Sequence, residues 1–335
     1  MSDSFAPFRP VFRNPHLATV LTSLWPRRLE ERRFPVQTRL FHTEPGTQVL
    51  IHSQRPSGAA QRPSGATERP PEPRGEVVLV HGLEGSSMAP YMLSMAQSLL
   101  DAGFAVHRTN IRSCGGTEFL CSTLYHAGLT KDIFSILTDL DRQRRTPVYL
   151  VGFSLGGNQC LKLAGELGDD AHRLLAGVVA ISAPIDLAAC CRALARPSNR
   201  LYQWRFLSSM RKRLRLRRPA IAAALPYDRL DRVRSVWEFD HLFTGPSFGF
   251  DGAEHYYSTQ SAIRYLDAIR VPTLVIQAQD DPMIPFAVFS HSAFHTNPQL
   301  MLAATAHGGH LGFLSSQAPR IWVDSAVTNW IVSRT

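Results

Sequence analysis

The residues with the clearest chemical meaning form a Gly-x-Ser-x-Gly motif at Gly152, Ser154 and Gly156. The motif follows an apolar run that predicts a strand, and it opens a segment that predicts a helix. A tight strand-to-helix turn leaves room only for small residues beside the serine and exposes the serine hydroxyl. The sequence therefore predicts Ser154 as a nucleophile. The amide of Leu155, at the start of that helix, is expected to donate a hydrogen bond to an oxyanion.

A serine hydroxyl needs a base that takes its proton, and the base needs an acid that orients it. One later apolar run ends in Asp280 and Asp281, and the next is followed by His307 and His310. The order serine, acid, histidine is one in which such triads occur, and both partners fall where strands end. The pattern leaves open which aspartate and which histidine act. A metal site on the two histidines is disfavoured, because no third ligand stands out.

A second oxyanion donor is expected from the loop after the first core strand, which reads LVHGLEGSS from Leu79. Glycine at position 82 lets the backbone turn closely. The amide of Leu83 would then point toward the oxyanion, together with that of Leu155.

Short apolar runs alternate with helix-like segments from residue 76 onward, after two expected strands within 38–53. This rhythm predicts an α/β protein with a mostly parallel central sheet and helices on both faces. We expect an N-terminal arm at 1–37, a core at 38–187 and 263–335, and an inserted helical cap at 188–262. Residues 54–75 contain the hexamer QRPSGA twice and predict a disordered surface loop.

The expected cap contains two patterns that could bind a lipid substrate. An apolar set at near-helical spacing is expected to form an acyl pocket; its members are Leu201, Trp204, Phe206, Leu207 and Met210. The basic run RKRLRLRR at 211–218 is expected to form an exposed helix face, and its sharper interpretation is docking to anionic lipid headgroups.

Composition narrows the class of protein further. The 335 residues carry a net charge of +9, yet we find no recognition motif for nucleic acid. The sequence has no membrane-spanning stretch and no secretory signal, so we expect a cytoplasmic protein that contacts anionic membranes peripherally. Five scattered cysteines indicate neither a disulfide framework nor a zinc site, and no cofactor is expected. The sequence does not indicate an oligomeric state.

Taken together, these motifs resemble the YheT-like branch of the α/β hydrolases, and the resemblance covers nearly the whole chain outside 54–75. It departs from the branch at Ala18, where glutamine is usual, and in the order Ser113-Cys114-Gly115-Gly116. Beyond the triad motifs, the matching segments are FRNPHLATVL near residue 16, HGLEGSS at 81–87, NIRSCGGTEF, YHAGLTKDI from Tyr125, and WEFDHLFTGPSFGFDGAEHYYSTQS at 237–261.

The resemblance implies an α/β-hydrolase fold and favours Asp281 as the acid and His310 as the base. It also implies hydrolysis of carboxylic esters, with medium-chain esters or acyl lipids as small-molecule substrates. Two alternatives remain: acyl transfer to another alcohol or thiol by the same triad, and a non-catalytic binding protein on this fold. The intact set Ser154, Asp281 and His310 disfavours the binding protein.

Overall fold

A single eight-stranded sheet forms the centre of the computed structural model, which describes residues 5–56, 72–143, 146–217 and 225–335. The strand order is β1-β2-β4-β3-β5-β6-β7-β8, with β2 antiparallel to both neighbours and the rest parallel. The strands are β1 (Gln37–Glu44), β2 (Thr47–Gln54), β3 (Glu76–Val80), β4 (Ala105–Thr109), β5 (Val148–Phe153), β6 (Gly177–Ile181), β7 (Thr273–Ala278) and β8 (Leu300–Thr305). The two strands expected within 38–53 are confirmed, as are the alternation of strands and helices from residue 76 and the fold class.

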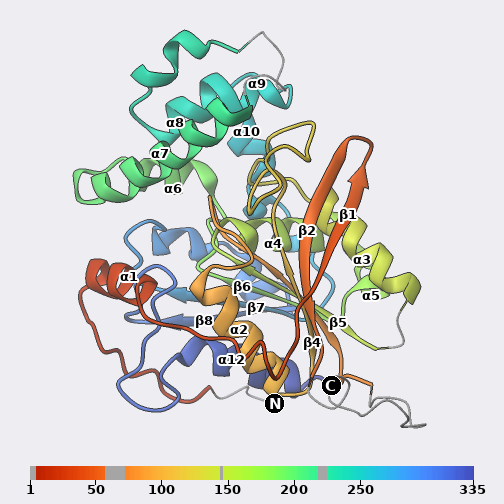
Figure 1. Ribbon diagram of the computed structural model, residues 1–335. Coiled ribbons are helices and arrows are strands. Elements are labelled where there is room, and N and C mark those ends of the chain that lie inside the picture. Colours follow the sequence, from red (N-terminus) through yellow and green to blue (C-terminus); the bar gives the residue numbers. More distant parts are fainter. Residues whose placement is uncertain (1–4, 57–71, 144–145, 218–224) are drawn as a thin grey trace.

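Helices cover both faces of this sheet, because alternate residues of the central strands point to opposite sides (Figure 1). Helices α2 and α12 pack together on one face, and α3, α4 and α5 lie on the other. The helices are α1 (Pro15–Ser23), α2 (Pro90–Asp101), α3 (Lys131–Gln143), α4 (Leu155–Leu167), α5 (Ala171–Leu174), α6 (Leu187–Leu194), α7 (Arg200–Arg217), α8 (Val236–Phe239), α9 (Gly245–Ser247), α10 (Ala253–Gln260), α11 (Ala293–Thr296) and α12 (Trp322–Val332).

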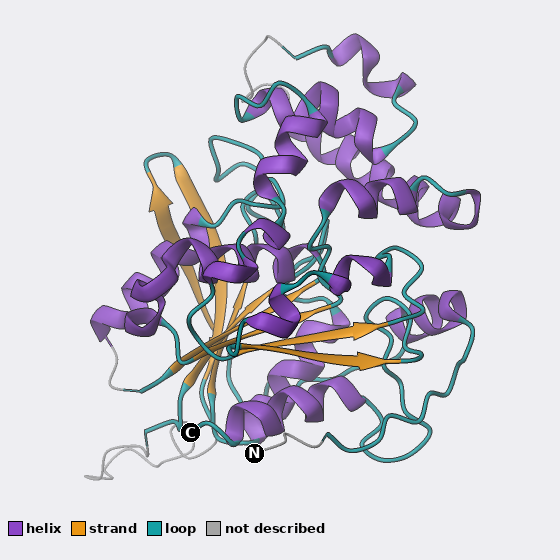
Figure 2. Cartoon of the chain, turned by 180° about the vertical axis from the view of Figure 1, so that it is seen from behind, coloured by secondary structure: helices purple, strands orange, loops and turns teal. Residues whose placement is uncertain are grey.

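Helices α6 to α10 lie together beyond one edge of the sheet, in the region where the sequence predicts a cap (Figures 1 and 2). We call residues 187–260 the insert. It follows β6 and precedes β7, so it emerges at the carboxyl ends of the parallel strands. Its described part contains helices and no strand. None of the described helices is both long and apolar enough to cross a membrane.

The loop expected at 54–75 is shorter than predicted at both ends. Gln54 is the last residue of β2 and is buried: its amide donates to the Phe34 carbonyl and accepts from Arg108. Pro73 is buried at the other end. Residues 57–71, with most of the QRPSGA repeat, lie outside the described residues.

Candidate active site

Ser154 lies at the junction of β5 and α4, in a backbone conformation that side chains rarely adopt, with φ 51° and ψ −121°. The two glycines of the motif are required by close packing. A Cβ atom on Gly152 would lie 2.4 Å from the Gly156 carbonyl oxygen, and one on Gly156 would lie 2.5 Å from the His81 carbonyl oxygen. The strand, the strained turn and the helix therefore hold the serine as the motif predicts.

The structure brings Ser154, His310 and Asp281 together from three loops at the carboxyl edge of the sheet. His310 Nε2 lies 3.0 Å from Ser154 Oγ, and His310 Nδ1 lies 2.8 Å from Asp281 Oδ2. A carboxylate only accepts, so Nδ1 carries the ring proton and Nε2 is left to accept the serine proton. The Asp281 side chain is fully buried, and its other oxygen accepts the amides of Met283 and Ile284.

The two alternative residues, Asp280 and His307, form a pair of their own. His307 Nδ1 donates to Asp280 Oδ2 at 3.1 Å, and Asp280 Oδ1 accepts the Gly309 amide at 2.9 Å. This pair is partly exposed, and no hydrogen bond joins it to Ser154. Its geometry favours Asp281 and His310 for the roles beside the serine.

The loop expected to provide an oxyanion donor is fixed by buried polar contacts. The Gly82 amide donates to Tyr91 Oη at 3.0 Å, and His81 Nδ1 donates to the Gly82 carbonyl at 2.7 Å. Burial lowers the pKa of His81 to about 4, so its ring is neutral and Nε2 accepts the Ile111 amide. Among the described residues, neither the Leu83 amide nor the Leu155 amide has an acceptor, so both are free to donate.

Arg213, from the basic run, is buried and paired, which contradicts the expected exposed helix face. Its guanidinium lies 2.6 Å from Glu84, next to Leu83, and 4.3 Å above the ring of Tyr125. The Tyr125 hydroxyl donates to the same Glu84 carboxylate at 2.8 Å. Removing one partner of a buried ion pair leaves the other charge uncompensated, at a cost of roughly 3–5 kcal/mol. Arg213 therefore anchors α7 to the loop after β3, and its side chain is not available to bind a lipid headgroup.

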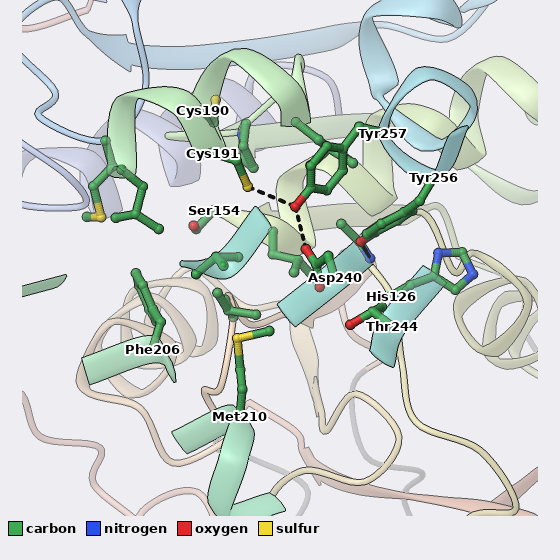
Figure 3. Close-up of a pocket in the computed structure, with 18 of the residues that line it drawn as sticks. His126, Ser154, Cys190, Cys191, Phe206, Met210, Asp240, Thr244, Tyr256 and Tyr257 are labelled. Atoms are coloured by element: carbon green, nitrogen blue, oxygen red, sulfur yellow. Dashed lines mark hydrogen bonds between the residues drawn. The ribbon is translucent and has the colours of Figure 1, made fainter. Parts of the chain in front are cut away.

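Two cavities meet at Ser154 and His310. The smaller, of about 110 Å³, extends beneath the insert, where Phe206 and Met210 contribute apolar walls (Figure 3). The larger, of about 450 Å³, opens between α1 and the first half of α7. Together they place the serine at the junction of two mostly apolar cavities, which we call the chamber (beneath the insert) and the cleft (between α1 and α7).

The chamber also has a polar wall. The Tyr257 hydroxyl donates to Asp240 Oδ2 at 2.6 Å and accepts from Cys191 Sγ at 3.1 Å, as the dashed lines in Figure 3 show. Burial raises the pKa of Asp240 to about 6. Sequence periodicity gave no signal for this group, because its residues come from α6, α10 and the segment after α8.

The apolar set predicted for the acyl pocket divides in three. Phe206 and Met210 line the chamber, whereas Leu207 is buried in the core. Leu201 and Trp204 are 62% and 63% exposed and line the cleft, so they lie outside the chamber. Leu207 follows Leu201 by six residues, and over that length α7 passes from the surface into the core.

Sequence reasoning missed the contribution of α1 to the site. The His310 amide donates to Thr19 Oγ1 at 2.8 Å, and Thr19 Oγ1 donates to the Pro15 carbonyl. A Cβ atom on Gly309, which has φ 57°, would lie 2.6 Å from the Pro15 carbonyl oxygen. Helix α1 therefore packs directly on the histidine loop. The FRNPHLATVL match was a signal, but it did not reveal the contact.

Comparison with known proteins identifies the family. The model of the α/β hydrolase fold family matches residues 76–317. The Escherichia coli protein named "Putative esterase YheT" is 31% identical over 99% of this chain and 94% of its own length. "Phospholipase ABHD3" of Mus musculus is 27% identical over 74% of this chain and 60% of its own length. The chain belongs to the α/β-hydrolase family, in the branch that includes YheT.

A solved structure supports the same fold. The esterase Pf2001 of Pyrococcus furiosus superimposes with a TM-score of 0.58, covering 92% of this chain and 98% of that one at 16% identity. Among the residues that the structure describes, no group of three or more His, Cys, Asp or Glu side chains could hold a metal ion.

Proposed function

We propose that this protein hydrolyses carboxylic esters through Ser154, His310 and Asp281. Ser154 Oγ attacks the ester carbonyl carbon while His310 Nε2 takes the hydroxyl proton. The amides of Leu83 and Leu155 stabilise the oxyanion, and His310 then protonates the leaving alcohol. Water attacks the acyl-enzyme, with His310 as base, and releases the acid. The observation that carries the proposal is the 3.0 Å and 2.8 Å contact chain from serine through histidine to the buried carboxylate.

Medium-chain esters or acyl lipids fit the shape of the site. We assign the acyl chain to the chamber beneath the insert and the alcohol part to the cleft. The insert would then act as a cap over the acyl chain. The names of the relatives, an esterase and a phospholipase, support this substrate class.

Labelling with a fluorophosphonate probe, followed by hydrolysis of p-nitrophenyl esters from acetate to palmitate, tests the proposal. We expect labelling at Ser154, turnover that peaks at an intermediate chain length, and neither in Ser154→Ala. A folded protein that is never labelled would instead be a binding protein. Adding ethanol to the assay separates the remaining alternative: ethyl ester as the main product would indicate acyl transfer.

A further inference from the structure

Helix α1 differs from an ordinary surface helix in the residues that it buries and exposes. It buries small or polar residues, Ala18, Thr19 and Thr22, against the histidine loop. It exposes Leu17, Leu21 and Leu24, which share one face at spacings of four and three residues; the exposed fraction reaches 71% at Leu24. Surface helices of globular proteins normally turn such a stripe toward the core. Leu17 and Leu21 are 49% and 39% exposed, so this face is covered only in part by the described chain.

The first half of α7 extends the same exposed surface. His16 of α1 stacks on Tyr202 of α7, with ring centroids 5.8 Å apart and a hydrogen bond of 3.1 Å. The two helices lie on the same side of the molecule in Figure 1. Close to Tyr202 in the sequence are the exposed Leu201 and Trp204, so exposed apolar side chains lie on both helices.

This surface borders the opening of the active-site cleft. Val20 and Ser23 of α1 line one side of the cleft, and Leu201 and Trp204 line the other, while Ser154 lies inside it. We call the exposed apolar residues around the opening the rim. Its members are Leu17, Leu21, Leu24, Trp25, Leu201 and Trp204.

The two segments that carry the rim are strongly basic, although Glu84 lines the cleft between them. Residues 5–29 contain four arginines and no acidic residue, and residues 187–217 contain eight arginines, one lysine and no acidic residue. Arg28, Arg196 and Arg200, which flank the rim in sequence, are exposed. An apolar face beside arginines is the composition of helices that lie in a membrane interface.

We propose that the rim docks on an anionic phospholipid surface, so that the active-site cleft opens directly onto the lipid. The leucines and tryptophans would enter the boundary between headgroups and acyl chains, and the flanking arginines would meet the negative surface potential. The substrate could then pass from the bilayer to Ser154 without crossing water. A second copy of the chain fits this face less well. In a two-fold symmetric dimer, each basic segment would face the same basic segment of the other copy, and the two would repel each other.

Co-sedimentation with phosphatidylcholine vesicles that contain ~30 mol% phosphatidylglycerol tests the docking surface. The variant Leu17→Gln/Leu21→Gln/Leu24→Gln keeps good helix formers at positions that do not line the cleft. We expect its partition coefficient to fall roughly 100-fold, since three leucine side chains no longer enter the interface. Turnover of p-nitrophenyl acetate should stay at the wild-type level.

A matched control replaces exposed apolar residues elsewhere: Leu40→Gln/Phe119→Gln/Phe134→Gln, which should bind vesicles as the wild type does. In a third variant, Arg28→Gln/Arg196→Gln/Arg200→Gln should lose roughly 100-fold on anionic vesicles, at about 1 kcal/mol per arginine, and little on pure phosphatidylcholine. Quenching of wild-type tryptophan fluorescence by brominated phospholipid provides evidence that needs no variant.

Equal partition of the leucine variant and the wild type would overturn the proposal, as would an absence of quenching. Light scattering that finds a wild-type dimer, made monomeric by the leucine variant, would assign the rim to a second copy instead. Vesicle binding does not depend on ester hydrolysis, so the docking proposal and the proposed function can fail separately.

Discussion

Two aspartate–histidine pairs lie side by side at the end of β7 and β8, and they differ in surroundings more than in geometry. The inner pair, Asp281 and His310, spans 2.8 Å, and the outer pair, Asp280 and His307, spans 3.1 Å. The side chains of the inner pair are 0% and 10% exposed, against 17% and 37% for the outer pair. Only the inner histidine reaches Ser154.

Under the proposed function, this difference separates a reacting pair from a positioning pair. A buried carboxylate held by backbone amides has one geometry, so it can fix the tautomer of His310. The outer carboxylate is closer to solvent, which weakens its hydrogen bond to His307. Asp280 nevertheless accepts the Gly309 amide, one residue before His310. The outer pair therefore connects the acid loop to the histidine loop and supports the inner pair.

The largest expected effect comes from removing the histidine of the inner pair or the serine that it contacts. Ser154→Ala and His310→Ala should each lower kcat for p-nitrophenyl butyrate by roughly 10⁴-fold or more, because the triad acts as a unit. Circular dichroism should remain that of the wild type. Appreciable turnover by a folded, pure Ser154→Ala protein would show that the nucleophile lies elsewhere.

The two aspartates should differ strongly when each is changed to asparagine. Asp281→Asn should lower kcat by roughly 10⁴-fold, since an amide no longer fixes the proton on His310 Nδ1. Asp280→Asn should cost less than about 10-fold, because an amide oxygen can still accept from Gly309. Steady-state kinetics of the two variants under one set of conditions decides the matter. The reverse ranking would exchange the roles of the two pairs.

The sequence could predict the inner pair because its signals are local. The Gly-x-Ser-x-Gly motif fixes Ser154, and the ends of β7 and β8 limit the partners to two aspartates and two histidines. The choice between them rested on resemblance. Consecutive residues at a strand end face different sides, and a pattern of residue types does not say which side holds the serine.

What the sequence could not predict depends on contacts between distant segments. Thr19 and His310 are 291 residues apart, and Arg213 reaches Glu84 across 129 residues. The alternation of arginine and leucine in 211–218 indicates an amphipathic helix, but not that Arg213 lies on the buried side. Likewise, the apolar spacing of α7 does not reveal where the helix enters the core, so it does not separate the exposed Leu201 and Trp204 from the buried Leu207.

Thr19 provides a smaller test of how the inner pair is held. In Thr19→Val the His310 amide loses its acceptor, which should cost about 2 kcal/mol of unfolding free energy and lower kcat roughly 10-fold. KM should not change, because Thr19 orients the histidine backbone. Thr19→Ser keeps the hydroxyl and should restore kcat. Thr22→Val is the matched control: Thr22 is buried on the same helix and its hydroxyl has no partner. Equal effects at both positions would reduce Thr19 to a packing residue.

The smallest expected effect comes from the outer histidine. His307→Ala removes a partly exposed hydrogen bond to Asp280, and a single hydrogen bond contributes about 1 kcal/mol. We therefore expect a loss of that size in urea unfolding and a change in kcat/KM of less than about 3-fold, since Asp280 still holds Gly309. A double-mutant cycle with Asp280→Asn isolates the coupling between the two side chains, which should be below about 1 kcal/mol.

A loss in kcat comparable to that of His310→Ala would contradict the division into reacting and positioning pairs, because it would mean that His307 takes part in proton transfer. A stability loss of several kcal/mol with unchanged kinetics would instead show that the outer pair is a main anchor of the histidine loop.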